Sequence, residues 1–169
     1  RAQAIFESLL VRNKASIRVT HLGRKEEIQA LLEASDSSLS PSGLVKEQGH
    51  FAGHDLFAEG AITIQDESSQ LVAPTLDLQG DEQVLDACAA PGGKTAHIAS
   101  YLTTGQVTAL DLYDHKLDLI QENAQRLGVA ERVQTQKLDA RKVHEFFGQN
   151  SFDKILVDAP CSGIGLLRR

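Results

Sequence analysis

Four aspartates stand at the ends of four apolar segments in the second half of the sequence. Asp86 follows the first segment, and Asp111, Asp139 and Asp158 follow three later ones. If the segments are parallel strands, their carboxyl ends meet at one edge of the sheet, where ligands bind in open α/β sheets. A single acid there is usually a helix cap. Four in phase predict one cleft, in which Asp111 binds ribose hydroxyls and Asp139 accepts from an adenine amino group.

A glycine turn follows the first of these acids. Its residues are Cys88-Ala89-Ala90-Pro91-Gly92-Gly93-Lys94. Glycines let a ligand approach the backbone, and the amides that begin the next helix point at it. A P-loop needs glycine where Cys88 stands, which nearly excludes an ATPase, and the dinucleotide pattern G-x-G-x-x-G is absent. A cofactor held by its adenosine and a charged tail, such as S-adenosylmethionine, fits these residues. A purely structural turn is the alternative.

The fourth acid opens a second loop, which places a thiol beside the same predicted cleft. The loop runs Asp158-Ala159-Pro160-Cys161-Ser162-Gly163. Enzymes that methylate an exocyclic amine usually carry an aromatic residue after a proline pair here, whereas this chain has Cys161 and Ser162. A cysteine suits carbon chemistry, because C5 of cytosine becomes nucleophilic only after a thiolate adds to C6. Such reactivity requires a lowered thiol pKa.

Alternating strands and helices must position these residues. Hydrophobic periodicity predicts strands at 83–86, 106–111, 132–137 and 152–157, and helices at 94–102, 114–127 and 141–147. This alternation predicts a parallel sheet with right-handed crossovers. Before it, strands at 16–20, 44–46 and 61–65 and helices at 24–34 and 67–76 predict a smaller mixed unit. We therefore divide the chain into a small α/β unit, 1–60, and a larger unit, 61–169.

Charge and composition narrow the class of protein. The chain has 169 residues, a net charge of −6 and two distant cysteines without metal-ligand or disulfide spacing. No apolar run is long enough to cross a membrane, and no signal peptide is visible. We expect a cytoplasmic monomer without metal. The segment 12–25 carries five basic side chains and no acid, which predicts RNA phosphate contacts; a solvated surface is the alternative.

Together these motifs resemble the RNA cytosine-5 methyltransferases of the Sun/Nol family, most closely the bacterial small-subunit ribosomal RNA enzymes of subfamily B. The matching stretches are Gln65-Asp66-Glu67-Ser68-Ser69-Gln70, Asp86 to Thr95, Ala109-Leu110-Asp111 and Asp158 to Gly163. The resemblance implies a Rossmann-like methyltransferase core that binds S-adenosylmethionine through the loop 88–94, Asp111, Asp139 and Asp158. It also implies an RNA-recognition role for the small unit and ribosomal RNA as the substrate.

The resemblance assigns Cys161 to product release rather than to nucleophilic attack. In this family the nucleophile is the cysteine of a Thr-Cys motif on a later strand, and this chain ends at Arg169 before such a strand. The chain also lacks methionine, so we expect it to be the middle of a longer protein and inactive alone. A non-catalytic RNA-binding or assembly module that kept the cofactor-binding fold is the alternative.

Overall fold

The structure is a computed structural model, and it describes residues 14–159. Its larger unit is built on a parallel sheet in the order β7-β6-β5-β8. These strands are β5 (Gln83–Asp86), β6 (Gln106–Asp111), β7 (Val133–Lys137) and β8 (Lys154–Leu156). All three pairings are parallel, with Val84 opposite Val107 and Val107 opposite Val133. The parallel sheet predicted from the strand–helix alternation is therefore confirmed.

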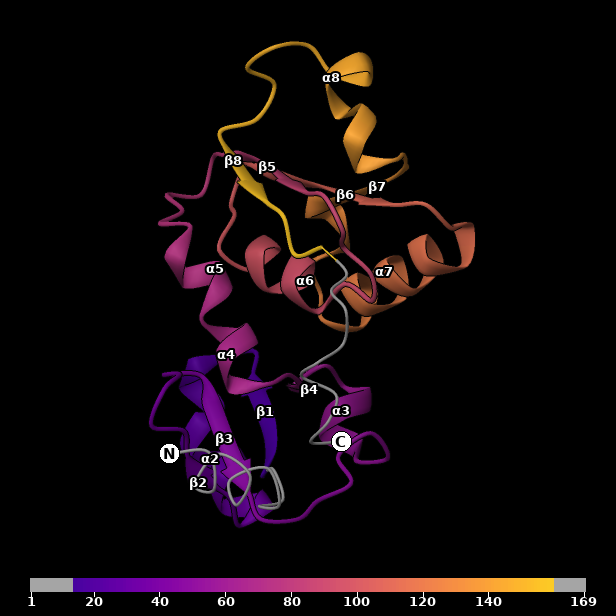
Figure 1. The fold of residues 1–169 in the computed structure, drawn as a ribbon. Helices are drawn as coiled ribbons and strands as arrows, with labels where there is room; N and C mark the ends of the chain where they lie inside the picture. The colour runs from indigo at the N-terminus through magenta and orange to yellow at the C-terminus, as the bar shows by residue number, and fades with distance from the viewer. Residues whose placement is uncertain (1–13, 160–169) are drawn as a thin grey trace, which may run out of the picture.

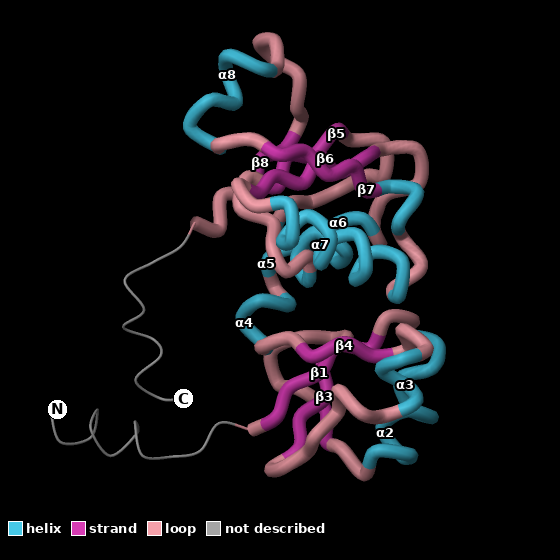
Figure 2. Tube along the Cα trace, turned by 90° about the vertical axis from the view of Figure 1, so that its right-hand side faces the viewer, coloured by secondary structure: helices cyan, strands magenta, loops and turns pink. Residues whose placement is uncertain are grey.

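Two helices cover one face of the parallel sheet, as Figures 1 and 2 show. They are α6 (Gly93–Ala99) and α7 (Asp114–Arg126). Their inner faces are apolar at helical spacing, and Ile98 and Ile120 are fully buried against Val107 and Ala109 of β6. On the opposite face lie the short η3 (Ala140–Lys142) and α8 (Val143–Phe146). A further turn, η2 (Ala130–Arg132), joins α7 to β7.

The N-terminal unit, residues 14–64, contains an antiparallel sheet in the order β2-β3-β1-β4. Its elements are β1 (Ala15–Val19), η1 (Leu22–Arg24), α2 (Lys25–Leu32), β2 (Ser35–Asp36), β3 (Gly43–Lys46), α3 (Asp55–Ala58) and β4 (Ile62–Ile64). Its separate core includes Ile17, Ile28, Leu44 and Ile62. Because β4 pairs with β1, this sheet extends past residue 60, where the sequence places the boundary.

The segment between the two units differs from the single helix predicted at 67–76. It forms two one-turn helices, α4 (Glu67–Gln70) and α5 (Val72–Thr75), which meet at Leu71. Pro74 has no N–H to donate to the Gln70 carbonyl, so a continuous helix would lose a bond of its ladder there. Among residues 14–159, no helix is long and apolar enough to cross a membrane.

The helix layer α6–α7 lies between the two sheets (Figures 1 and 2), so it forms the contact between the units. His97 of α6 is buried there, with its ring 5.5 Å from that of Tyr101. Burial, assisted by the charge of Arg18, lowers the pKa of His97 to about 3. Arg18 of β1 is also buried and donates from Nε to Oε1 of Gln65 at 2.8 Å. The contact therefore holds the Arg18 cation beside a His97 that stays neutral.

This contact predicts a pH-dependent stability. An unfolded histidine binds a proton below about pH 6.5, whereas folded His97 stays neutral down to about pH 3, so unfolding takes up a proton between these values. Stability should fall as the pH is lowered through this window, by at most about 1.4 kcal/mol per pH unit. We expect His97→Phe to have a shallower decline than the wild type when the free energy of unfolding is measured in urea at pH 7 and pH 5.

The matched control is His144→Phe, because His144 is exposed on α8. It should keep the wild-type pH dependence. Equal slopes for His97→Phe and His144→Phe would contradict a neutral buried His97.

Candidate functional site

The loop 88–94 joins the central strand β5 to α6, and backbone bonds fix its course. The Ala87 N–H donates to the Leu156 carbonyl at 2.9 Å, and the Ala89 N–H donates to the Leu110 carbonyl at 3.0 Å. The Gly92 N–H then closes the turn on the Ala89 carbonyl at 2.7 Å, and the Ala90–Pro91 peptide is cis. The loop is thus tied to both neighbours of β5 before the chain enters the helix.

Gly92 is required in this loop for two reasons. Its φ is +100°, in the left-handed region that side chains rarely adopt, and a Cβ there would lie 3.0 Å from Cα of Ile120 on α7. Gly93 differs, because a Cβ on it would meet no atom within 4 Å. One glycine therefore packs the loop against α7, and the other leaves open space beside the backbone.

Asp86 does not line a cleft with Asp111 and Asp139, contrary to the prediction. Its side chain is almost fully buried, and Oδ2 accepts from the Thr95 hydroxyl at 2.7 Å. Burial raises the pKa of this carboxyl, and the hydrogen bond from Thr95 opposes the rise. The direction of its side chain explains the error, since a strand-end acid can turn under the following loop. Asp86 holds the start of α6 to the end of β5.

A pocket of about 760 Å³ opens at the carboxyl ends of the strands. Its polar lining includes Asp111, Asp139, Lys116 and Arg141, together with Cys88. Its apolar walls are formed by Leu85, Leu112, Tyr113, Leu138, Val143, Ile155 and Val157. A mostly apolar pocket of this size with a few polar groups is typical of sites for small molecules and cofactors.

Asp111 is oriented by its own turn. Its Oδ1 accepts from the backbone N–H groups of Leu112 at 2.7 Å and Tyr113 at 3.2 Å. Its Oδ2 lies 3.9 Å from Nζ of Lys116, at the edge of ion-pair distance. A carboxylate held in this way keeps acceptor capacity toward the pocket, because each oxygen has two lone pairs. The geometry is that of a fixed acceptor for a ligand with hydroxyl or amino groups.

Asp139 lines the same pocket but has a strong partner within the chain. Arg141 donates to its two oxygens through Nε and the terminal nitrogen, the latter at 2.6 Å from Oδ2. The Arg141 N–H also donates to Oδ1, so Asp139 caps η3. These bonds lower the pKa of Asp139 to about 2. The carboxylate is therefore ionised, and Arg141 competes with any other donor.

Asp158 and Cys88 belong to the two loops that follow strands β8 and β5. Asp158, which is also predicted to share the cleft, does not line the pocket. Its Oδ2 pairs with Nζ of Lys94 at 2.6 Å, linking the end of the fourth strand to the start of α6. Burial, followed by the nearby carboxylates Asp86, Asp111 and Asp158, raises the pKa of the Cys88 thiol above its ordinary value. Cys88 is therefore protonated at neutral pH and unsuited to nucleophilic attack.

In the part of the chain described, no group of three or more His, Cys, Asp or Glu side chains could hold a metal ion.

A strand-end pocket beside a glycine loop agrees with the comparison to known families. A family model described as 16S rRNA methyltransferase RsmB/F matches residues 73–169, more than half of the chain. The chain belongs to this family. It is 45% identical over 175 residues to the probable ribosomal RNA small subunit methyltransferase B of Bacillus subtilis (strain 168), an alignment that covers 99% of this chain. The chain spans only 39% of that relative's length.

Two solved structures share the fold of this RsmB/F chain. The crystal structure of PH0851 is 34% identical in sequence with a TM-score of 0.86, and the alignment covers 96% of this chain and 39% of that chain. A methyltransferase homolog from Pyrococcus horikoshii is 29% identical in sequence with a TM-score of 0.82, and the alignment covers 100% of this chain and 57% of that chain. The predicted Rossmann-like methyltransferase core, preceded by a small α/β unit, is therefore confirmed.

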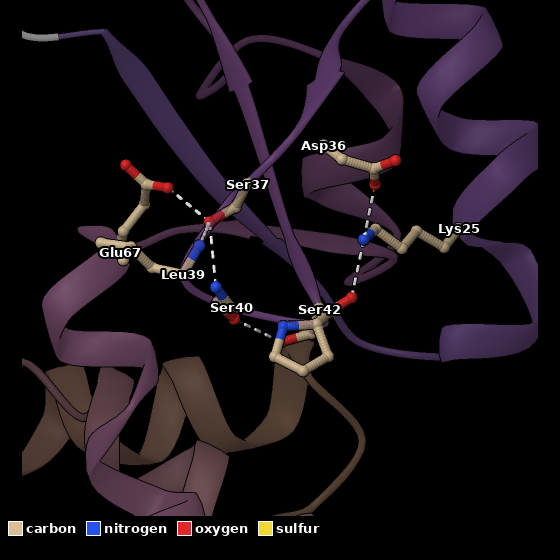
Figure 3. Close-up of polar contacts among 8 residues, drawn as sticks. Lys25, Asp36, Ser37, Leu39, Ser40, Ser42 and Glu67 are labelled. Carbon is tan, nitrogen blue, oxygen red and sulfur yellow. Dashed lines mark hydrogen bonds and ion pairs between the residues drawn. The ribbon is translucent and has the colours of Figure 1, made fainter.

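In the segment 12–25 of this RsmB/F chain, the RNA contact predicted for Arg18 is wrong, and the contacts predicted for the other basic residues stay predictions. Arg18 is buried and bonded to Gln65, so it cannot reach a phosphate. Lys25 donates to the Pro41 carbonyl and pairs with Asp36, each at 2.7 Å (Figure 3). Lys14 and Arg24 pair with Glu47 and Glu27. A stretch of sequence without acids does not become a surface without acids, because acids from outside the stretch fold against these cations. Arg12 lies outside the described residues.

The family stretch 65–70 proves to be a structural junction. Gln70 is fully buried, and its Nε2 donates to the Gln65 carbonyl at 2.9 Å and to Ser16 Oγ at 3.2 Å. Glu67 accepts from the Ser37 hydroxyl, which in turn accepts from the N–H groups of Leu39 and Ser40 (Figure 3). The first turn of the linker is thus bonded to β1 and to the loop after β2.

The sequence analysis missed Lys116 and Arg141 in the pocket and Asn123 and Arg126 on α7. The signal for the first two is a basic residue shortly after each strand-end acid. For Asn123 the signal is a polar side chain next to the buried Ile120 and Ala124 of α7, and for Arg126 the sequence holds no such signal. Cys161, for which a role in product release is predicted, lies outside the described residues, and so does Pro160.

The loop geometry predicts different effects for the two adjacent glycines. Gly92→Ala should destabilise the ligand-free chain by about 1–3 kcal/mol, because of the left-handed backbone and the contact with Ile120. Gly93→Ala should be neutral or stabilising by up to about 1 kcal/mol, because alanine favours the helix that begins there. Thermal unfolding of both variants measures the difference. Equal destabilisation by both would show that the loop is not held against α7 as described.

Proposed function

We propose that this chain is the cofactor-binding part of an enzyme that transfers a methyl group from S-adenosylmethionine to C5 of a cytosine in small-subunit ribosomal RNA. The observation that carries the proposal is the pocket beside the loop 88–94, with the fixed acceptor Asp111 on its wall, in a chain of the RsmB/F family. The relatives' names supply the RNA substrate, and the cytosine C5 position comes from the family resemblance.

The residues of the pocket fit S-adenosylmethionine. Asp111 would accept from the ribose hydroxyls, and the apolar walls from Leu112 to Val157 would surround the adenine. The open space beside Gly93 leaves room for the charged tail along the loop 88–94. Asp139 would accept from the adenine amino group once the mostly exposed Arg141 side chain moves aside. Asp158 would act with Lys94 at the tail.

The other assignments extend beyond the residues that the structure describes. We propose that Cys161 assists product release in the complete enzyme, and that a cysteine on a later strand attacks C6 of the base. The target cytosine must leave its stack to reach either thiol. The monomeric state, the absence of a metal and the cytoplasmic location stay predictions from the sequence.

The test of the cofactor assignment is the affinity for S-adenosylhomocysteine. Asp111→Asn should weaken binding by about 1–3 kcal/mol, roughly fivefold to 150-fold, because one carboxylate acceptor is replaced by a donor facing hydroxyl groups. Isothermal titration calorimetry with the whole chain measures this. The control is Asp118→Asn, which makes the same change of charge on the exposed side of α7 and should bind like the wild type.

Equal affinity of Asp111→Asn and wild type would overturn the ribose assignment. Binding of small-subunit ribosomal RNA by a wild-type chain without measurable affinity for the cofactor would favour the non-catalytic RNA-binding module.

The role of Cys161 requires the complete protein. If Cys161 acts after methylation, Cys161→Ala should accumulate a covalent protein–RNA adduct, because the enzyme cannot release the attacked base. The adduct is visible as a shifted band on a denaturing gel. The wild type trapped on RNA that contains 5-fluorocytosine provides the reference band. If Cys161→Ala gives no adduct while the wild type is trapped, Cys161 is the nucleophile and the assignment to product release is wrong.

A further inference from the structure

Arg126, at the end of α7, is the main polar contact from the helix layer to the N-terminal unit. Its terminal nitrogens donate to the carbonyls of Phe57 at 2.9 Å and Ile62 at 3.3 Å, and to the Thr63 hydroxyl at 3.3 Å. The guanidinium also lies over the Phe57 ring, 3.9 Å from its centre. Because Arg126 meets acceptors of α3 and β4, its side chain is positioned by the way in which the N-terminal unit docks.

A close backbone approach strengthens this docking. Gly60 has φ +74°, and a Cβ on it would lie 1.9 Å from the Arg126 carbonyl oxygen. No side chain can be accommodated there, so the chain before β4 rests directly on the end of α7. The position of Arg126 relative to the N-terminal unit is therefore fixed through both its backbone and its side chain.

Asn123, one turn earlier on α7, connects Arg126 to the loop 88–94 by two hydrogen bonds. Its Oδ1 accepts from Arg126 at 3.0 Å, and its Nδ2 donates to the Pro91 carbonyl at 2.7 Å. A guanidinium only donates and a carbonyl only accepts, so these two partners admit a single orientation of the amide. Arg126 therefore holds Asn123 in the one orientation that can bond the loop.

We propose that Asn123 is a positioning residue for the cofactor loop, and that it makes the affinity for the cofactor depend on the docking of the N-terminal unit through Arg126. The Asn123 bond to Pro91 and the contact of Gly92 with Ile120 fix adjacent residues of the loop against the same face of α7. The inference rests on the proposed function, because it concerns the same site. Its consequence is that an RNA that tightens the docked unit would also tighten cofactor binding, and the reverse.

Two variants test the Asn123–Pro91 bond and the Arg126 contacts one at a time. Asn123→Asp keeps an acceptor for Arg126 but replaces the donor to Pro91 with a carboxylate that repels its carbonyl. It should lower the affinity for S-adenosylhomocysteine about tenfold, the effect of one hydrogen bond to a partner left unpaired. Arg126→Lys keeps the charge, but one ammonium group cannot reach all the acceptors that the guanidinium spans, so affinity should fall less, about threefold.

The decisive measurement is the double variant. If Arg126 acts through Asn123, adding Arg126→Lys to Asn123→Asp should cause no further loss of affinity. Glu122→Gln, on the exposed side of the same helix, is the control and should bind like the wild type. Additive losses in the double variant, or an unchanged affinity in Asn123→Asp, would overturn the inference.

A second readout does not depend on the cofactor. In the ligand-free chain, the amide NMR signals of Gly92 and Gly93 should shift in both Asn123→Asp and Arg126→Lys, and stay in place in Glu122→Gln. If the wild type binds no S-adenosylhomocysteine, the proposed function fails, and these shifts still test whether Arg126 positions the loop. Unmoved loop signals in Arg126→Lys would refute the link even if the wild type binds the cofactor.

Discussion

The site depends on the close packing of the loop 88–94 against α7. Gly92 meets Ile120 at a distance that leaves no space for a side chain, and it does so in a left-handed conformation. This contact lets the chain leave β5, turn within a few residues and enter α6 beside the strand ends. The buried bond from Thr95 to Asp86 fastens the other side of the turn. The contact and the bond together fix the course of the chain from β5 to α6 at the edge of the pocket.

The strand-end acids have different chemical properties although they occupy equivalent positions in the sequence. Burial raises the pKa of Asp86, whereas the Arg141 guanidinium lowers the pKa of Asp139 to about 2. Asp111 is held by backbone amides at the pocket wall, and Asp158 pairs with Lys94 outside it. Burial, followed by the charges of Asp86, Asp111 and Asp158, raises the pKa of the Cys88 thiol. The environment of each group separates one structural acid from the acceptors available to a cofactor.

The helix layer that supports the loop also carries the N-terminal unit. The inner side of α7 packs on the parallel sheet through Ile120 and Ala124, while Arg126 extends from its end to α3 and β4. The contact beside it keeps one cation, Arg18, and a neutral His97. Two sheets that are separate in sequence are thereby joined by a single layer of helices, and the site lies at the strand ends of the parallel sheet.

The sequence by itself determined the order of the larger unit and most of the site. Strand–helix alternation, strand-end acids and the glycine turn are local patterns, and the structure brings three of the residues that they singled out, Cys88, Asp111 and Asp139, together at one pocket. Only the tertiary structure decided which way each side chain points and what folds against it. Asp86 turns under the loop, Arg18 is buried against Gln65, and Asn123 bonds Pro91 across 32 positions of the sequence. The physical reason is that burial and pairing depend on segments far apart in the chain, which no local pattern encodes.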